Sequence, residues 1–170
     1  IDTDHPEFMG KISEWSYDAT NDRIVKDYDL SVIEDENGHG TSVAGVIGAN
    51  WGDGGIAGIA PDVTLLVIKA ECNELGQFAR TSDLVFGLYY AIEQGANVVN
   101  MSFGSSGDAF SDALALAYDS DIICVAAAGN DSTSVMTYPA ASPLAIGVGA
   151  LLGIVGGITV VVIALIAVIM

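Results

Sequence analysis

The sequence predicts an α/β protein, with a doubly wound, mostly parallel sheet that carries helices on both faces, followed by one C-terminal hydrophobic helix. Three observations lead to this prediction. The chain has 170 residues, of which 51% are hydrophobic, enough for one globular core. Between residues 62 and 150, short apolar runs alternate with helical patterns, as in βαβ units. From residue 150 to the end no residue is charged.

The predicted strands are nearly continuous apolar runs, as expected for strands that are covered on both faces. They span Asp62–Ala70, Ala96–Gly104, Asp121–Asn130 and Leu144–Ala150. In sheets of this kind, functional residues gather at the carboxyl ends of the strands. We therefore expect Ser102–Gly104 and Ala128–Asn130 to contribute to a site.

Two helices are predicted between these strands. The pattern over residues 81–95 places apolar side chains on one stripe, and Gly95 is a typical C-terminal stop. The stripe consists of Leu84, Val85, Leu88, Ala91 and Ile92. Residues 111–120 predict a second, shorter helix.

The segment from Ala150 to Met170 changes character abruptly. It is long enough to cross a hydrocarbon core of roughly 30 Å, so we interpret it as a transmembrane helix. A pair of buried β-strands is the alternative, because Val and Ile dominate the segment. The predicted organisation is therefore one globular domain at 1–149 and a membrane helix at 150–170.

The composition excludes several classes of function. A net charge of −17 repels phosphate backbones, so we expect no nucleic-acid partner. Cys72 and Cys124 form no C-x-x-C pair and predict no disulfide scaffold. His5 and His39 are the two histidines of the chain, too few for a His-rich zinc site.

The stretch NGHGTSVAG, residues 37–45, allows two interpretations. As H-G-T it offers His39 at a helix start, a candidate general base with glycines on both sides that leave its ring accessible. As G-T-S it offers Ser42 as a candidate nucleophile. The residues alone do not decide between the two.

Five motifs occur in order along the chain: IDTDHPEF (1–8), GHGTSVAGVIGA (38–49), GIAGIAP (55–61), NVVNMSFG (97–104) and VAAAGN (125–130). Together they resemble the subtilisin-like serine proteases, from Ile1 to about Ala150. The resemblance implies a truncated subtilisin-like peptidase domain. The second motif is similar to the family's histidine motif and not to its serine motif, which ends in A-x-P. By this resemblance His39 is the catalytic base and Ser42 a bystander.

The resemblance also implies roles for residues at the strand ends. Asn130 would donate its side-chain amide to the oxyanion of the reaction intermediate. Ser102, Phe103 and Gly104 would form the edge that pairs with a polypeptide substrate, and Ala127, Ala128 and Gly129 the opposite wall. Considered without the resemblance, Asn130 is also a typical turn residue, and the alanines equally suit close packing of strands.

The glycine-rich loop Asn50–Gly58 is not a phosphate-binding loop, because it lacks the lysine and follows no strand. In the family the corresponding loop holds calcium. Glu7, Asn50 and Asp53 are therefore candidate ligands of a structural calcium ion, with a solvated surface loop as the alternative. The chemistry itself is expected to need no cofactor.

Two members of a serine-protease triad are not found in the sequence. The resemblance would put the aspartate just upstream of Ile1, and Asp2 and Asp4 lie at the wrong offset. The serine motif, expected after residue 150, is absent. We therefore predict a secreted or surface-displayed serine endopeptidase whose present stretch alone is inactive. The alternative is a catalytically inactive, membrane-anchored module that binds peptides or has a structural role.

Overall fold

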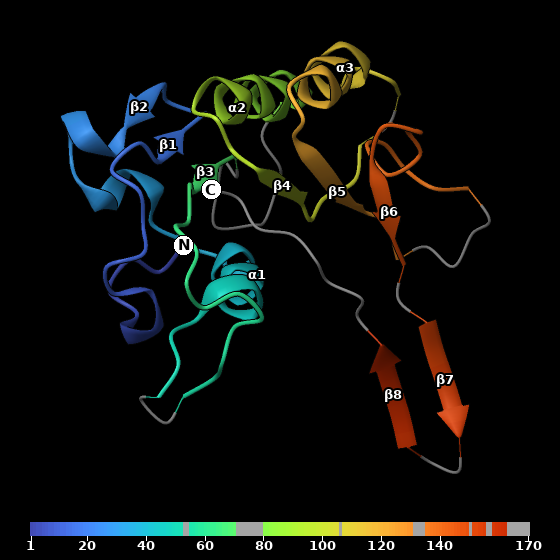
Figure 1. The fold of residues 1–170 in the computed structure, drawn as a ribbon, viewed down its shortest axis with the longest axis horizontal. Helices are drawn as coiled ribbons and strands as arrows, with labels where there is room; N and C mark the ends of the chain where they lie inside the picture. The colour runs from blue at the N-terminus through green and yellow to red at the C-terminus, as the bar shows by residue number, and fades with distance from the viewer. Residues whose placement is uncertain are drawn as a thin grey trace.

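The computed structural model describes residues 1–52, 55–70, 80–105, 107–130, 135–149, 151–155 and 158–162. Figure 1 shows their arrangement. The helices are α1 (His39–Gly48), α2 (Thr81–Glu93) and α3 (Ser111–Asp119), with short 3₁₀ helices η1 (Pro6–Phe8), η2 (Val25–Asp27) and η3 (Leu30–Ile33). The strands are β1 (Tyr17–Asp18), β2 (Arg23–Ile24), β3 (Ile68–Lys69), β4 (Val98–Met101), β5 (Ile123–Ala127), β6 (Ile146–Val148), β7 (Leu151–Val155) and β8 (Ile158–Val162).

The parallel sheet β4-β5-β6 confirms the second half of the predicted α/β pattern. Its strands and the helices α2 and α3 fall inside the ranges expected from the sequence. The two helices lie side by side over the sheet (Figure 1). Between helices and sheet lies a core that includes Leu88, Val99, Phe110, Leu114 and Cys124.

The strand predicted at residues 62–70 is shorter in the structure and belongs to a different sheet from the one expected. Its assigned part is β3, which pairs in parallel with β1, and β1 pairs antiparallel with β2. In the described part of the chain, the sheet β2-β1-β3 is separate from β4-β5-β6, so the single continuous sheet was a wrong prediction. The physical reason is that the facing sides of β3 and β4 border a cavity instead of pairing.

Helices nevertheless cover both faces of the extended segment before β3. Leu65 and Val67 belong to a core with α1 residues such as Ile47. Leu66 and Ile68 belong to the core of α2 and α3. Because successive side chains of an extended chain point to opposite faces, α1 and α2 pack on opposite sides of this segment. The prediction of helices on both faces is confirmed here.

The predicted C-terminal helix is not what the described residues form. β7 and β8 pair antiparallel, with Leu151 opposite Val162 and Val155 opposite Ile158. Val and Ile, which dominate the segment, favour strands. The strand alternative therefore describes this segment better than a helix does. Residues 163–170 lie outside the described residues.

No helix in the described part of the chain is long and apolar enough to cross a membrane. The hydrophobicity of residues 150–170 had suggested such a span, because hydrophobicity alone does not separate a membrane helix from apolar strands. The prediction of a membrane anchor therefore has no support from the structure.

Candidate active site

One carboxylate holds the start of α1. Asp35 Oδ1 accepts the backbone N–H groups of Asn37 (2.9 Å) and Gly38 (2.7 Å). Its Oδ2 accepts the backbone N–H (2.8 Å) and the hydroxyl (2.6 Å) of Thr41. Burial by itself raises the pKa of Asp35, but these hydrogen bonds outweigh it and hold the pKa far below its usual range. An ionised Asp35 thus fixes the turn from which His39 emerges.

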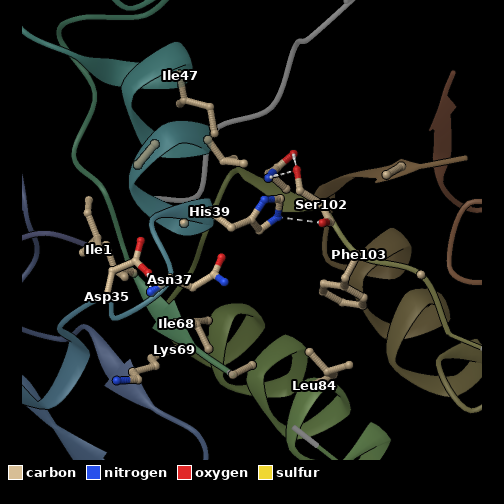
Figure 2. A pocket seen from close by; sticks show the side chains of 18 of the residues that line it. Ile1, Asp35, Asn37, His39, Ile47, Ile68, Lys69, Leu84, Ser102 and Phe103 are labelled. Atoms are coloured by element: carbon tan, nitrogen blue, oxygen red, sulfur yellow. Dashed lines mark hydrogen bonds between the residues drawn. The ribbon is translucent and has the colours of Figure 1, made fainter. Parts of the chain in front are cut away.

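His39 is the first residue of α1, and its ring is directed toward the end of β4 (Figure 2). Its Nε2 lies 3.0 Å from the backbone carbonyl oxygen of Ser102. Because a carbonyl oxygen only accepts, Nε2 carries a proton in this contact. Among the residues that the structure describes, no carboxylate bonds this ring.

Neither serine near His39 is placed as its nucleophile. His39 contacts the carbonyl of Ser102, while the Ser102 hydroxyl lies 2.9 Å from Nδ2 of Asn100. The hydroxyl of Ser42 donates to the Gly38 carbonyl at 2.8 Å, one turn back in α1. A histidine can activate a serine only when the serine hydroxyl lies within hydrogen-bond distance of the imidazole. Neither Ser42 nor Ser102 therefore has its hydroxyl bonded to the His39 ring.

A cavity of about 760 Å³ joins the predicted site residues. α1 and the β3 segment form one side, and the ends of β4 and β5 form the other. Of the predicted catalytic and substrate-binding residues, those that line it are His39, Ser102, Phe103, Gly104, Ala127, Gly129 and Asn130. Ala128 is not among the lining residues, and its backbone N–H bonds the Val148 carbonyl instead. The fold thus brings together segments that are up to ninety residues apart, from His39 to Asn130.

Two other groups near the site are not free to react. Lys69 Nζ donates to the Glu34 carbonyl at 2.7 Å and pairs with Glu36 at 3.0 Å. Burial raises the pKa of Cys124 to about 11, so this thiol stays protonated at neutral pH. Cys72 lies outside the described residues. Neither the Lys69 amine nor the Cys124 thiol is therefore available as a nucleophile.

Asp35 and Thr137 are among the residues of the cavity wall that sequence reasoning missed. Asp35 had no typical capping signal, because the N-cap position is Gly38, three residues later. Thr137 had no local signal. Thr137 packs against Gly104 so closely that a Cβ on Gly104 would lie 2.7 Å from Thr137 Oγ1, so glycine is needed at that position.

The three candidate calcium ligands are described in part. Glu7 is 4% exposed; its Oε1 accepts the Ile56 N–H at 3.1 Å, and its Oε2 is buried without a hydrogen-bond partner. Asn50 donates its side-chain amide to the Met9 carbonyl, at 3.4 Å. Asp53 lies outside the described residues. Within the described ranges no three acidic, His or Cys side chains are grouped as a metal site. Of the two described candidates, Glu7 has a buried carboxylate oxygen without a partner, a type of oxygen that calcium binds.

His39 lies at a helix start and its ring reaches the end of a parallel strand across the cavity, the edge where ligands bind in open α/β sheets. The comparisons with known proteins identify the class more closely. Residues 1–153 match the subtilase family, peptidase family S8. The chain therefore belongs to the subtilase family, whose members are serine proteases.

Three relatives illustrate the match. The chain is 36% identical over 155 residues to the major intracellular serine protease of Bacillus subtilis, covering 87% of this chain and 47% of that protein. It is 39% identical over 124 residues to the minor extracellular protease Epr of the same organism, covering 71% and 19%. The solved structure of sphericase superposes with a TM-score of 0.78 at 29% identity, covering 95% of this chain and 54% of that one.

The chain spans about half the length of the first of these relatives and of sphericase. The family confirms the prediction made from the five sequence motifs. The roles of the individual site residues remain predictions, since they follow from the family pattern and from their common cavity.

Proposed function

We propose that the full-length protein is a serine endopeptidase that hydrolyses polypeptides with His39 as general base and then general acid. The observation that carries this proposal is the position of His39, with its ring in the cavity and 3.0 Å from the strand-end carbonyl of Ser102. An extended peptide can pair with the edge at Ser102–Gly104 through main-chain hydrogen bonds. The scissile bond then lies beside the imidazole.

The proposed mechanism needs a different tautomer of His39 from the one described. To take a proton from a serine, Nε2 must be free, so the ring proton must sit on Nδ1. A carboxylate beside Nδ1 stabilises that arrangement and the imidazolium that follows. The missing aspartate is therefore the group that converts the present contact into a catalytic one.

Ile1 supports a position for that aspartate. It lines the same cavity as His39, and its amino group donates to the Ile33 carbonyl at 2.8 Å. A residue that precedes Ile1 would thus enter the cavity close to α1. Asp2 and Asp4 make no contact with the imidazole among the described residues; Asp2 instead accepts the Asp4 N–H at 3.2 Å. We place the aspartate before Ile1 and the serine beyond the described residues.

Asn130 is proposed as a side-chain donor to the oxyanion. It lines the cavity where β5 gives way to a loop, and its side chain is exposed. In the full-length enzyme, Asn130→Ala is expected to lower kcat on the order of 10²- to 10³-fold with little change in KM, a magnitude taken from subtilisin. Asn130→Asp, which keeps the shape and loses the donor, should show a similar loss. Steady-state kinetics on a peptide anilide measures both variants, and an unchanged kcat would exclude Asn130 from this role.

We also propose a structural calcium ion bound near Glu7. Its unpartnered Oε2 is the described oxygen that fits such an ion. The ion would tie η1 to the loop that follows α1, where Glu7 already bonds Ile56. It would take no part in the chemistry.

The endopeptidase proposal is tested on the full-length protein with fluorescent casein and a fluorophosphonate that labels activated serines. We expect casein hydrolysis, covalent labelling, and loss of both after pretreatment with a serine-protease inhibitor. Hydrolysis without labelling would contradict the serine mechanism. A folded full-length protein that neither cleaves nor is labelled, and still binds peptides, would instead be the inactive peptide-binding module.

A further inference from the structure

The segment at the start of the chain is fastened to the loop that precedes His39. Ile1 N donates to the Ile33 carbonyl (2.8 Å) and Asp2 N to the Thr41 hydroxyl (2.7 Å). Thr3 donates its hydroxyl to Glu34 at 2.6 Å. Three consecutive residues thus bond to residues that lie more than thirty positions later in the sequence.

Asp35 takes part in one of these connections, the bond between Asp2 and Thr41. Its Oδ2 accepts the hydroxyl of Thr41, and the same hydroxyl oxygen accepts the N–H of Asp2. Its Oδ1 accepts Asn37 and Gly38 N–H, where Gly38 has a φ of 87° that side-chain-bearing residues rarely adopt. One carboxylate therefore fixes the turn before α1 and, through Thr41, the segment at Ile1.

We propose that Asp35 is a positioning residue that holds His39 in register with the segment at Ile1–Thr3. This inference rests on the proposed function, because the triad aspartate is expected just before Ile1. Asp35 does not contact the imidazole itself. It acts through the backbone of Gly38 and through the side chain of Thr41. A displacement of about 1 Å between catalytic groups costs up to roughly a hundredfold in rate, so such a restraint matters for catalysis.

Nuclear magnetic resonance tests the geometric part without any need for activity. The chain has two histidines, so the His39 ring signals are assigned by comparison with His39→Gln, and His5 is an internal control. In the unmodified protein, we expect one sharp set of His39 ring signals, from a ring that is held in a single position and tautomer. In Asp35→Asn, we expect averaged or broadened His39 ring signals and unchanged His5 signals. Unchanged His39 signals would overturn the proposal.

Asp29→Asn is the matched control. Asp29 also accepts a backbone N–H and a hydroxyl, both from Ser31, at the start of η3, and it does not line the cavity. We expect this variant to leave the His39 signals unchanged. A similar effect of both variants would indicate a general loss of stability and would contradict positioning by Asp35.

Kinetics of the full-length enzyme separates positioning from stability. Below the unfolding temperature, Asp35→Asn is expected to lower kcat roughly ten- to hundredfold and to leave KM nearly unchanged. Thr41→Val should act in the same direction, and Thr41→Ser, which keeps the hydroxyl, should restore kcat. If Asp35→Asn does not fold, the two Thr41 variants still test the positioning role. Equal kcat for Thr41→Val and Thr41→Ser would overturn the proposal.

The two experiments distinguish this inference from the proposed function. If the unmodified full-length protein hydrolyses no peptide, the proposed function fails, and the ring signals still show whether Asp35 positions His39. If the protein is active and Asp35→Asn keeps full kcat, the proposed function stands and the positioning role is wrong.

Discussion

His39→Ala is expected to lower the kcat of the full-length enzyme on the order of 10⁶-fold, the loss known for the triad histidine of subtilisin. The reason is that His39 is the imidazole among the described residues that line the cavity, and it is the proposed acceptor of the serine proton. Lys69 is paired with Glu36, and the Cys124 thiol is buried in the core between the sheet and the helices α2 and α3. Casein hydrolysis measured over several hours with purified enzyme gives the dynamic range that such a loss requires.

Ser42→Ala is the control for this experiment. The Ser42 hydroxyl donates to the Gly38 carbonyl, and its side chain is exposed on the outside of α1. We expect this variant to keep nearly full activity. Loss of activity in a normally folded Ser42→Ala protein would show that the G-T-S interpretation of the stretch was the right one. Retained activity in His39→Ala would remove the histidine from the mechanism.

Phe110→Ala is expected to destabilise the protein by about 3–5 kcal/mol, the usual cost of emptying a buried aromatic site. Phe110 is 0% exposed and lies just before α3, where its ring is 5.8 Å from that of Phe103. Because Phe103 lines the cavity, the loss also loosens one wall of the site. Native domains are stable by only about 5–15 kcal/mol, so this one change removes a large share.

Phe86→Ala is the matched control for the stability measurement. Phe86 lies on α2 with 63% of its surface exposed. A change at such a position usually stays within about 0.5 kcal/mol. Urea unfolding followed by circular dichroism compares the two variants with the unmodified protein. Equal midpoints for Phe110→Ala and Phe86→Ala would contradict the packing described around Phe110.

The sequence predicted the elements around the cavity well because their patterns are local. The strands β4, β5 and β6 lie in short, nearly continuous apolar runs, and α2 shows an apolar stripe with the helical period. The C-terminal segment was predicted wrongly because its composition suits two structures. A run of Val and Ile without charges fits both a membrane helix and a pair of strands, and the decision between them lies in strand pairing.

The short strands and 3₁₀ helices of the first third were not predicted. β1 and β2 have two residues each, too few to show a period of two in the sequence. β1 forms by pairing with β3, fifty residues later, so a contact that is distant in sequence creates it. The same holds for Thr137, whose role depends on its approach to Gly104.

By itself, the sequence determined the family, the α/β class and the residues His39, Ser102–Gly104 and Asn130 as candidates for one site. It did so because motifs and hydrophobic periods are properties of neighbouring residues. Only the tertiary structure decided that these residues share a cavity, that β3 and β4 belong to separate sheets, and that Asp35 ties the His39 turn to Ile1–Thr3. Those facts arise from hydrogen bonds and packing between segments thirty to ninety residues apart, and no local pattern specifies them.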